Sequence, residues 1–384
     1  MSFMSTRFAG AVAGLSAIAI AGAASAEVDL PNNLAWTAYD TGSSGHAQSV
    51  AIGKAFKEKY GVNLRVLPGK NDVSRLRPLQ QKKVDAVANG VGTYFSQEGV
   101  FDFASADWGP QEVRVIMSST GSAGLMVGVV DDVDVKTYAD LKGKRVAWVK
   151  SASALNHNVT AFLAFADLTW DDVEKVEFAG FGASWEGMTN DQVDAAFAIT
   201  VSGSTKAVAS SPRGLIWPPL PHDDTAGWER LKAVAPYFNK QNVAAGTNVS
   251  KDAPVQGAVY PYPILTMRAD ADDKLAYNTT KAMVESFDNY KDGAPGAAGW
   301  AMANQAFEWA VPYHDGAIDY FKEIGVWTDA MQAHNDALVD RQGVLKTAWE
   351  AYKVVAPSDD DAFKTGWMAA RAVALTAAGM PVVF

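Results

Sequence analysis

Apolar segments of strand length alternate with helical patterns along most of this chain, and this alternation constrains the fold more than any other feature. Ile52, Phe56 and Tyr60 recur on one face of a predicted helix over residues 46–60. The first series of predicted strands covers residues 33–39, 63–69, 84–90 and 112–118. Strands separated by helices pair in parallel and are covered on both faces, so the pattern predicts an α/β fold.

A second series begins near residue 125 and has the same character. It predicts strands over residues 124–130, 145–151, 175–181, 193–200 and 214–220, followed by an extended run over 258–270 and mostly helices from 271 onward. The two series join near residues 121–128 and 257–266. We therefore expect a two-lobed molecule, with lobe 1 formed by residues 27–124 and 264–384, including the C-terminal helices, and lobe 2 by residues 125–263. A ligand would lie between the lobes, at the C-terminal ends of the strands.

The first residues have the features of a secretory signal. Arg7 precedes an apolar stretch, which ends in the small-residue pattern Ala24-Ser25-Ala26. This pattern predicts cleavage after Ala26 and an exported, periplasmic protein with a signal peptide over residues 1–26. Removing that peptide would leave about 358 residues, too many for one ordinary core. The formal charge of −10 disfavours nucleic acid as a partner, and the absence of cysteine excludes disulfides and thiolate chemistry.

A small polar turn joins the first predicted strand to the first predicted helix. The start of a helix has unpaired backbone N–H groups and a partial positive charge, so small neighbours would let an anion approach. The predicted carboxylate site here consists of Thr41, Gly42, Ser43, Ser44, Gly45 and His46. The alternative is that Ser43 or Ser44 only caps the helix.

Similar polar residues follow other predicted strands, in both lobes. Trp148 is near one of these turns, and like Trp185 it would either line the cleft, stack on a cation or pack in the core. Three such turns at strand ends together predict an interlobe cleft. The further predicted ligand-binding residues are Asn89, Gly90, Tyr94, Trp148, Ser151, Ala152, Ser153, Thr200 and Ser202.

The sequence has no pattern that indicates catalysis. Its five histidines form no HxxxH or HExxH spacing, which disfavours a metal site. Neither a G-x-S-x-G nucleophile elbow nor a GxxxxGK[ST] loop is present. The pairs Asp131-Asp132 and Asp171-Asp172 fit solvated turns or helix starts better than acid–base chemistry. We therefore predict no enzyme activity, no metal and no cofactor.

Several segments, in order, resemble the solute-binding subunit of TRAP transporters of the TAXI type. The similar segments are Thr41–His46, Lys83–Asn89, Asp140–Val146 with Trp148 and Lys150–Ser153, Val193–Ala195, and Val311–Ile318. They are spread from residue 34 to about 326. The resemblance implies a type II-like periplasmic-binding-protein (Venus-flytrap) fold with a helical C-terminal region. It also implies a receptor that captures a small carboxylate and delivers it to a TRAP-type membrane permease.

The sequence departs from the family pattern at the turns themselves. Ser43 replaces a glycine, His46 an aromatic residue, and the second-lobe turn is Ser-Ala-Ser instead of glycine-rich. These changes leave the identity of the ligand open. Three alternatives stay open as well: a receptor of an ABC importer or a sensor, a receptor for a zwitterion or quaternary amine that uses pocket aromatics, and a secreted α/β hydrolase. We expect a monomer.

Overall fold

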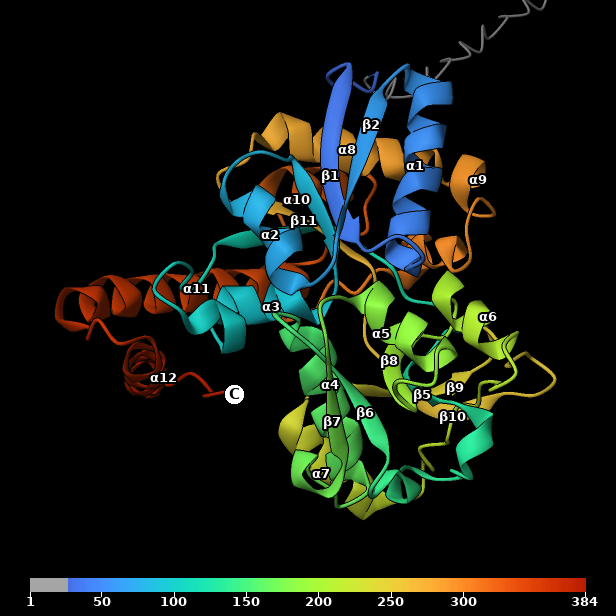
Figure 1. Cartoon of the computed structure of the whole chain (residues 1–384). Helices are drawn as coiled ribbons and strands as arrows, with labels where there is room; N and C mark the ends of the chain where they lie inside the picture. Colours follow the sequence, from blue (N-terminus) through green and yellow to red (C-terminus); the bar gives the residue numbers. More distant parts are fainter. Residues whose placement is uncertain (1–26) are drawn as a thin grey trace, which may run out of the picture.

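The computed structural model describes residues 27–384, so the predicted signal peptide over residues 1–26 lies outside the described residues. Two helix-covered β-sheets organise the chain, one above the other in Figure 1. We call the part built on the first sheet lobe 1 (residues 27–118 and 264–384) and the part containing the second sheet lobe 2 (residues 125–259). The predicted α/β, two-lobed fold class is confirmed.

Lobe 1 contains a five-stranded sheet in the order β2-β1-β3-β11-β4. The first three strands are parallel, whereas β11 runs antiparallel to both neighbours. The strands are β1 (Asn33–Tyr39), β2 (Asn63–Gly69), β3 (Ala86–Asn89), β4 (Val113–Ser118) and β11 (Ile264–Arg268). The helices are α1 (Ser44–Tyr60), α2 (Asp72–Gln80), α3 (Val91–Glu98), η1 (Phe101–Ala104), α8 (Asp273–Glu285), α9 (Phe287–Tyr290), η5 (Ala297–Trp300), η6 (Met302–Asn304) and α10 (Asp315–Glu323).

Lobe 2 contains a four-stranded sheet in the order β5-β8-β6-β7 and a separate β9-β10 hairpin. Here β6 is parallel to β7 and β8, and β5 is antiparallel to β8. The strands are β5 (Leu125–Val129), β6 (Arg145–Val149), β7 (Glu174–Phe178), β8 (Ala195–Ile199), β9 (Asn239–Val243) and β10 (Val255–Val259). The helices are η2 (Asp131–Val133), η3 (Tyr138–Leu141), α4 (Ser153–Phe165), η4 (Trp170–Asp172), α5 (Phe181–Thr189), α6 (Gly203–Ala209) and α7 (Thr225–Val234).

Local chemistry sets the ends of α1, the helix after the first polar turn. The Ser43 hydroxyl accepts a hydrogen bond from the His46 amide at 3.2 Å, which caps the first turn. The helix ends at Gly61, whose φ of 73° is the left-handed conformation that glycine adopts easily. Ile52 and Phe56 are buried on one face of the helix, as the periodicity predicted.

Two connections carry the chain between the lobes. Residues 119–124 lead from β4 to β5, and residues 260–263 lead from β10 back to β11. They are hydrogen-bonded to each other, because Tyr262 N donates to Ser119 O at 2.7 Å and Ser119 N donates to Pro263 O at 2.9 Å. Paired extended segments of this kind are suited to act as a hinge between two rigid sheets.

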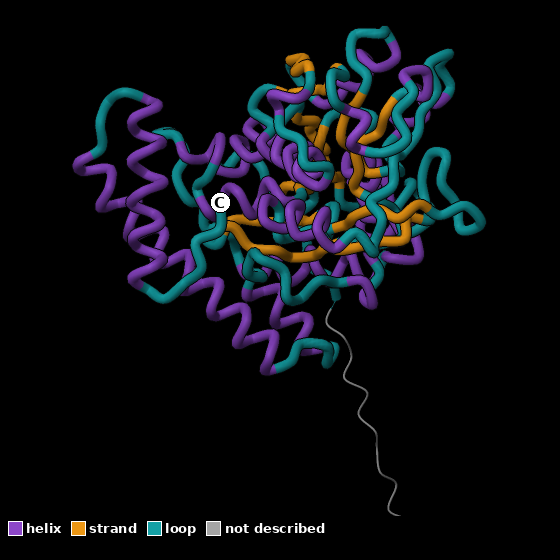
Figure 2. The backbone as a smooth tube through the Cα atoms, turned by 90° about the horizontal axis from the view of Figure 1, so that it is seen from below, coloured by secondary structure: helices purple, strands orange, loops and turns teal. Residues whose placement is uncertain are grey.

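Two long helices project from lobe 1 as a hairpin, drawn in red in Figure 1. They are α11 (Asp329–Val355) and α12 (Asp360–Ala377). After α12 the chain returns to the body of the molecule, where the C mark lies in both Figure 1 and Figure 2. None of the helices within residues 27–384 has the length and apolar character needed to cross a membrane.

One predicted strand is wrong. Residues 214–220 form no regular strand, and only Ile216 makes an isolated bridge, to Val129. Pro218 and Pro219 in this segment have no N–H to donate to a ladder, which explains why pairing does not continue.

Candidate functional site

A small interlobe cavity lies where the strand ends of both sheets meet the returning connection. Its volume is about 30 Å³, the space of one water molecule, so the lobes are closed against each other. Lobe 2 contributes mainly apolar side chains, lobe 1 contributes polar ones such as Arg75, and the returning connection contributes Tyr260 and Tyr262. The lining residues are Tyr39, Ser43, Arg75, Gly90, Val91, Leu125, Ala154, Leu155, Phe181, Phe197, Ala198, Ile199, Ser202, Tyr260 and Tyr262.

Several buried hydrogen-bonding groups at this cavity have no partner within residues 27–384. They include Arg75 Nε and the Tyr39 hydroxyl, both on lining residues. Ser44 Oγ and Asn89 Nδ2, on the sequence neighbours of the lining residues Ser43 and Gly90, are also buried and unpartnered among residues 27–384. Buried polar groups are nearly always hydrogen-bonded in proteins. All four groups can donate a hydrogen bond, so together they suit a ligand rich in acceptor oxygens.

Arg75 is the charged residue of this cavity and is only 1% exposed. Its guanidinium carbon lies 3.7 Å from the centre of the Tyr39 ring, and one of its terminal nitrogens forms an ion pair with Asp72. Burial raises the pKa of Asp72, although the Arg75 charge opposes this. Burial, together with the Asp72 charge, also raises the pKa of Tyr39, so that the tyrosine keeps its proton and can donate it to an acceptor.

Helix starts in lobe 2 are hydrogen-bonded to acceptors of lobe 1. At α4, Ala154 N donates to Asp72 Oδ2 at 2.7 Å and Ser153 N donates to Asp102 Oδ2 at 3.1 Å. At α5, Gly182 N donates to Asp40 Oδ2 at 3.3 Å. Carboxylates at helix starts are favourable electrostatically, so these contacts hold the lobes together. Within the predicted Ser151–Ser153 turn, the Ser153 amide is thus bonded to a carboxylate of the protein itself, and the Ala152 amide donates to Val149 O at 3.3 Å.

The glycines of the first turn, and Gly90 at the start of α3, have a role that the sequence did not reveal. A Cβ at Gly45 would lie 3.0 Å from the Tyr262 hydroxyl, and one at Gly90 would lie 2.7 Å from the Tyr262 ring. At Gly42, with φ 93°, the carbonyl accepts a hydrogen bond from Ser204 N of lobe 2 at 3.2 Å. These glycines therefore admit the Tyr262 ring and the close approach of lobe 2.

The structure brings together only part of the predicted site. Ser43, Gly90 and Ser202 line the cavity, Gly45 lies beside the lining residue Tyr262, and Ser44 and Asn89 are sequence neighbours of lining residues. Thr41 is exposed, and His46 is half-buried, with burial lowering its pKa. Tyr39, Arg75 and Tyr262 line the cavity although the sequence did not single them out. Arg75 lies inside a helix, where no local pattern marks it as different from the nearby Arg77.

Other predicted residues lie elsewhere. Trp148, Ser151 and Ser153 line a separate groove of about 320 Å³ with Asp102 and His157. The Trp148 ring packs against Trp170, with Lys175 above it, and Trp185 is buried between Phe181 and Trp217. Tyr94 packs against Phe384. Thr200 donates from its hydroxyl to Ala245 O at 2.6 Å and accepts from Gly124 N, whereas Ala152 precedes α4 and is buried.

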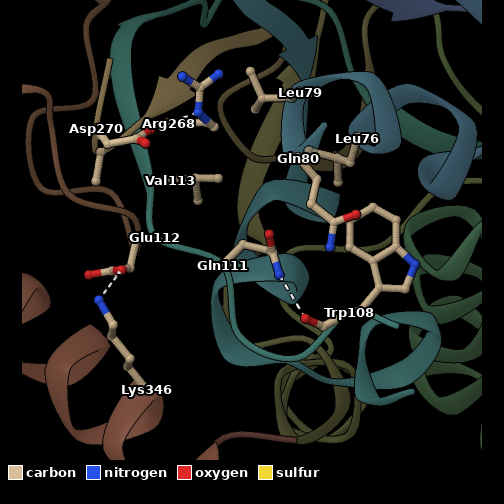
Figure 3. Close-up of a pocket in the computed structure, with 11 residues that line it drawn as sticks. Leu76, Leu79, Gln80, Trp108, Gln111, Glu112, Val113, Arg268, Asp270 and Lys346 are labelled. Atoms are coloured by element: carbon tan, nitrogen blue, oxygen red, sulfur yellow. Dashed lines mark hydrogen bonds and ion pairs between the residues drawn. The ribbon is translucent and has the colours of Figure 1, made fainter. Parts of the chain in front are cut away.

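Two larger pockets open at the surface, outside the interlobe cavity. One of about 580 Å³ borders the hinge and shares Ile199, Tyr260 and Tyr262 with the cavity. The other, of about 500 Å³, lies on lobe 1 and is shown in Figure 3. Its charged side chains are paired with neighbours, for example Lys346 with Glu112 at 2.7 Å and Arg268 with Asp270 at 2.7 Å. Among residues 27–384, no cluster of three or more metal-binding side chains is found.

Comparisons with solved structures find binding proteins at low similarity. An ancestral arginine-binding protein bound to arginine is 14% identical, with 69% of this chain and 97% of that chain covered and a TM-score of 0.43. The alkanesulfonate-binding protein SsuA from Xanthomonas axonopodis pv. citri, bound to MOPS, is 14% identical, with 83% and 95% covered and a TM-score of 0.41. An ABC transporter periplasmic binding protein from Brucella ovis with glutathione bound is 11% identical, with 78% of each chain covered and a TM-score of 0.44. Similarity at this level identifies no ligand.

The sequence comparisons give one result. A family described as the NMT1-like family matches residues 41–325. No curated protein matches the chain at a significant level.

Proposed function

The chain belongs to the NMT1-like family, and from this premise we propose that it is an exported solute receptor that encloses a small organic anion between its lobes. The observation that carries the proposal is the group of unpartnered donors at the interlobe cavity, with the buried Arg75 as its positive charge. A carboxylate or similar acid would accept hydrogen bonds from Arg75 Nε, the Tyr39 hydroxyl and Ser44 Oγ. The ligand would be bound and not converted.

Binding would couple to lobe movement. The cavity of about 30 Å³ is too small for an organic acid, so the lobes would separate slightly around the bound anion or open to admit it. Asp40, Asp72 and Asp102 would then act as contacts that favour closure. The free energy for closing around the ligand would come from the ligand's preference for the arrangement that encloses it over the open one.

The resemblance to TAXI-type subunits supports a TRAP permease as the membrane partner and the periplasm as the location. An ABC importer is the competing partner. The flanking genes distinguish the two, because an adjacent ATPase gene would support the ABC importer and a large permease gene without an ATPase would support the TRAP transporter.

A cationic ligand is a less suitable alternative. The Arg75 guanidinium already lies over the Tyr39 ring, where a ligand cation would bind. Trp148 and Trp185, the aromatics that would form a cage, are not among the lining residues. The Asp72 carboxylate is already bonded to Arg75 and to Ala154 N.

The test uses Tyr39→Phe, because this change removes only a hydroxyl that has no partner among residues 27–384. We expect its free energy of unfolding without ligand to be unchanged or higher, since an unsatisfied buried group is removed. Affinity for the bound acid should fall about 10- to 100-fold, the effect of losing a hydrogen bond to a charged group. Titration calorimetry with glutamate, 2-oxoglutarate and alkanesulfonates measures the affinity.

Tyr290→Phe is the matched control. The Tyr290 hydroxyl is likewise buried and unpartnered within the described part of the chain, but Tyr290 lies in α9 and not at the cavity. If both variants bind every acid as the wild type does, the cavity is not the site. If a neutral or cationic solute stabilises the wild type and no acid does, the anion proposal is wrong.

A further inference from the structure

We propose that Phe384 is a latch that favours the closed arrangement of the lobes; this inference rests on the proposed function, since it concerns regulation of the same cavity. The Phe384 ring lies at the junction of the lobes, within an aromatic cluster. Ring centres in lobe 1 lie 5.4 Å (Tyr94), 5.1 Å (Phe95) and 5.6 Å (Phe101) from it, and ring centres in lobe 2 lie 5.5 Å (His157) and 6.5 Å (Tyr237) from it.

The segment that carries Phe384 is fixed to lobe 1. Arg341 donates to Pro381 O at 2.9 Å, and Arg371 donates to Val383 O at 2.7 Å. Both arginines also pair with the fully buried carboxylate of Glu98, at the end of α3. A segment held by buried charged hydrogen bonds moves with the lobe that holds it. Phe384 is therefore a fixed part of lobe 1 that contacts lobe 2.

The contact on lobe 2 leads to the cavity wall. The Tyr237 hydroxyl donates to Asn158 Oδ1 at 2.7 Å, and Asn158 Nδ2 donates to the hydroxyl of Tyr260 at 2.9 Å. Tyr260 lines the cavity, and its ring centre lies 5.3 Å from that of Tyr237. Separating the lobes would pull Phe384 away from this connected set, so its contacts with His157 and Tyr237 contribute only to the closed form.

The hairpin and the segment after it lie beyond residues 41–325, the part that the NMT1-like family matches. The latch would therefore be an addition by residues 326–384 to the two-lobed receptor. Aromatic pairs contribute about 0.5–1.5 kcal/mol each beyond their buried area, and Phe384 makes two such pairs across the junction. We expect its loss to lower the ratio of closed to open molecules about tenfold.

The experiment measures the distance between the lobes in the full mature chain without solute. Because the chain contains no cysteine, Glu58→Cys in lobe 1 and Lys136→Cys in lobe 2 place one spin label on each. Both native side chains are exposed, at 57% and 84%. Double electron–electron resonance then gives the closed and open fractions of the labelled parent, of Phe384→Ala and of Val382→Ala. Val382→Ala is the control, because Val382 is 45% exposed.

We expect the parent and Val382→Ala to share a measurable closed fraction, and the closed-to-open ratio of Phe384→Ala to be about tenfold lower. Equal closed-to-open ratios in Phe384→Ala and Val382→Ala, or a parent that is entirely open, would contradict the proposal that Phe384 is a latch. Circular dichroism checks that the variants are folded, and Phe384→Leu, which retains apolar contact, should fall between them. A second arm adds L-glutamate and 2-oxoglutarate: if neither changes the distance in any protein, the proposed function loses support while the first arm still decides the latch.

Discussion

Asp102 gives the sharpest test of how the lobes are held together. Its carboxylate accepts hydrogen bonds from the amide and the hydroxyl of Ser153 at the start of α4, and its own amide donates to Ser153 Oγ at 3.2 Å. Asp102→Asn keeps an acceptor but removes the charge. A hydrogen bond to a charged group contributes about 1.5–3 kcal/mol and a charge at a helix start about 0.3–1 kcal/mol. Because Asp102 is half-buried, solvent reduces the net effect to about 1–2 kcal/mol.

This loss of stabilising free energy affects only the closed form, since the open form exposes Asp102 to water. We expect solute affinity to fall about 5- to 30-fold in Asp102→Asn, with the free energy of unfolding of the open protein unchanged. Calorimetric titration measures the affinity. Asp107→Asn is the control, because Asp107 is exposed in the same segment and its backbone carbonyl, which the change leaves intact, accepts hydrogen bonds from Arg77 and Gln80 of lobe 1. If the two variants bind equally well, the Asp102 contact does not contribute to closure.

Two further predictions concern buried charge. Burial lowers the pKa of His157 from 6.5 to about 4, so between these pH values the unfolded chain takes up a proton that the folded chain does not. The free energy of unfolding should therefore fall by about 2 kcal/mol as the pH drops from 6.5 to 4. Urea unfolding should show a shallower decline in His157→Phe, and a decline identical to that of the wild type would contradict the role of His157. Glu98→Gln leaves Arg341 and Arg371 without their buried counter-charge and should lower the free energy of unfolding by about 3–5 kcal/mol. Glu112→Gln, at an exposed pair with Lys346, should lower it by less than about 1 kcal/mol. Similar urea midpoints for the two variants would contradict this expected difference in stability.

Local periodicity was enough to predict most of the fold. The strand over residues 33–39 and the helix beginning near residue 46 depend on side-chain spacing within a few residues, and both are present as β1 and α1. The strand predicted over residues 214–220 is wrong, because an apolar run suggests a strand even where prolines cannot join a ladder. Sequence spacing is a good guide where the deciding interactions are local.

The candidate site depends on contacts between distant parts of the chain, and these explain what the sequence could not predict. Tyr262 fills the space beside Gly45 and Gly90 only after the chain has returned from lobe 2. The amide of Ser153 is taken by Asp102, 51 residues away in sequence. Ser43, Gly90 and Ser202 do line the cavity, as predicted. They follow strands, and the C-terminal ends of the strands meet at the cavity irrespective of which side chains they carry.

The most direct test of the central claim is mass spectrometry of the small molecules released when the purified mature protein is denatured. We expect a small organic acid, released in near-stoichiometric amount from the wild type and from Tyr290→Phe and in much smaller amount from Tyr39→Phe. Release of a neutral or cationic solute, in equal amount from all three proteins, would contradict the claim that Arg75 and Tyr39 hold an anion between the lobes.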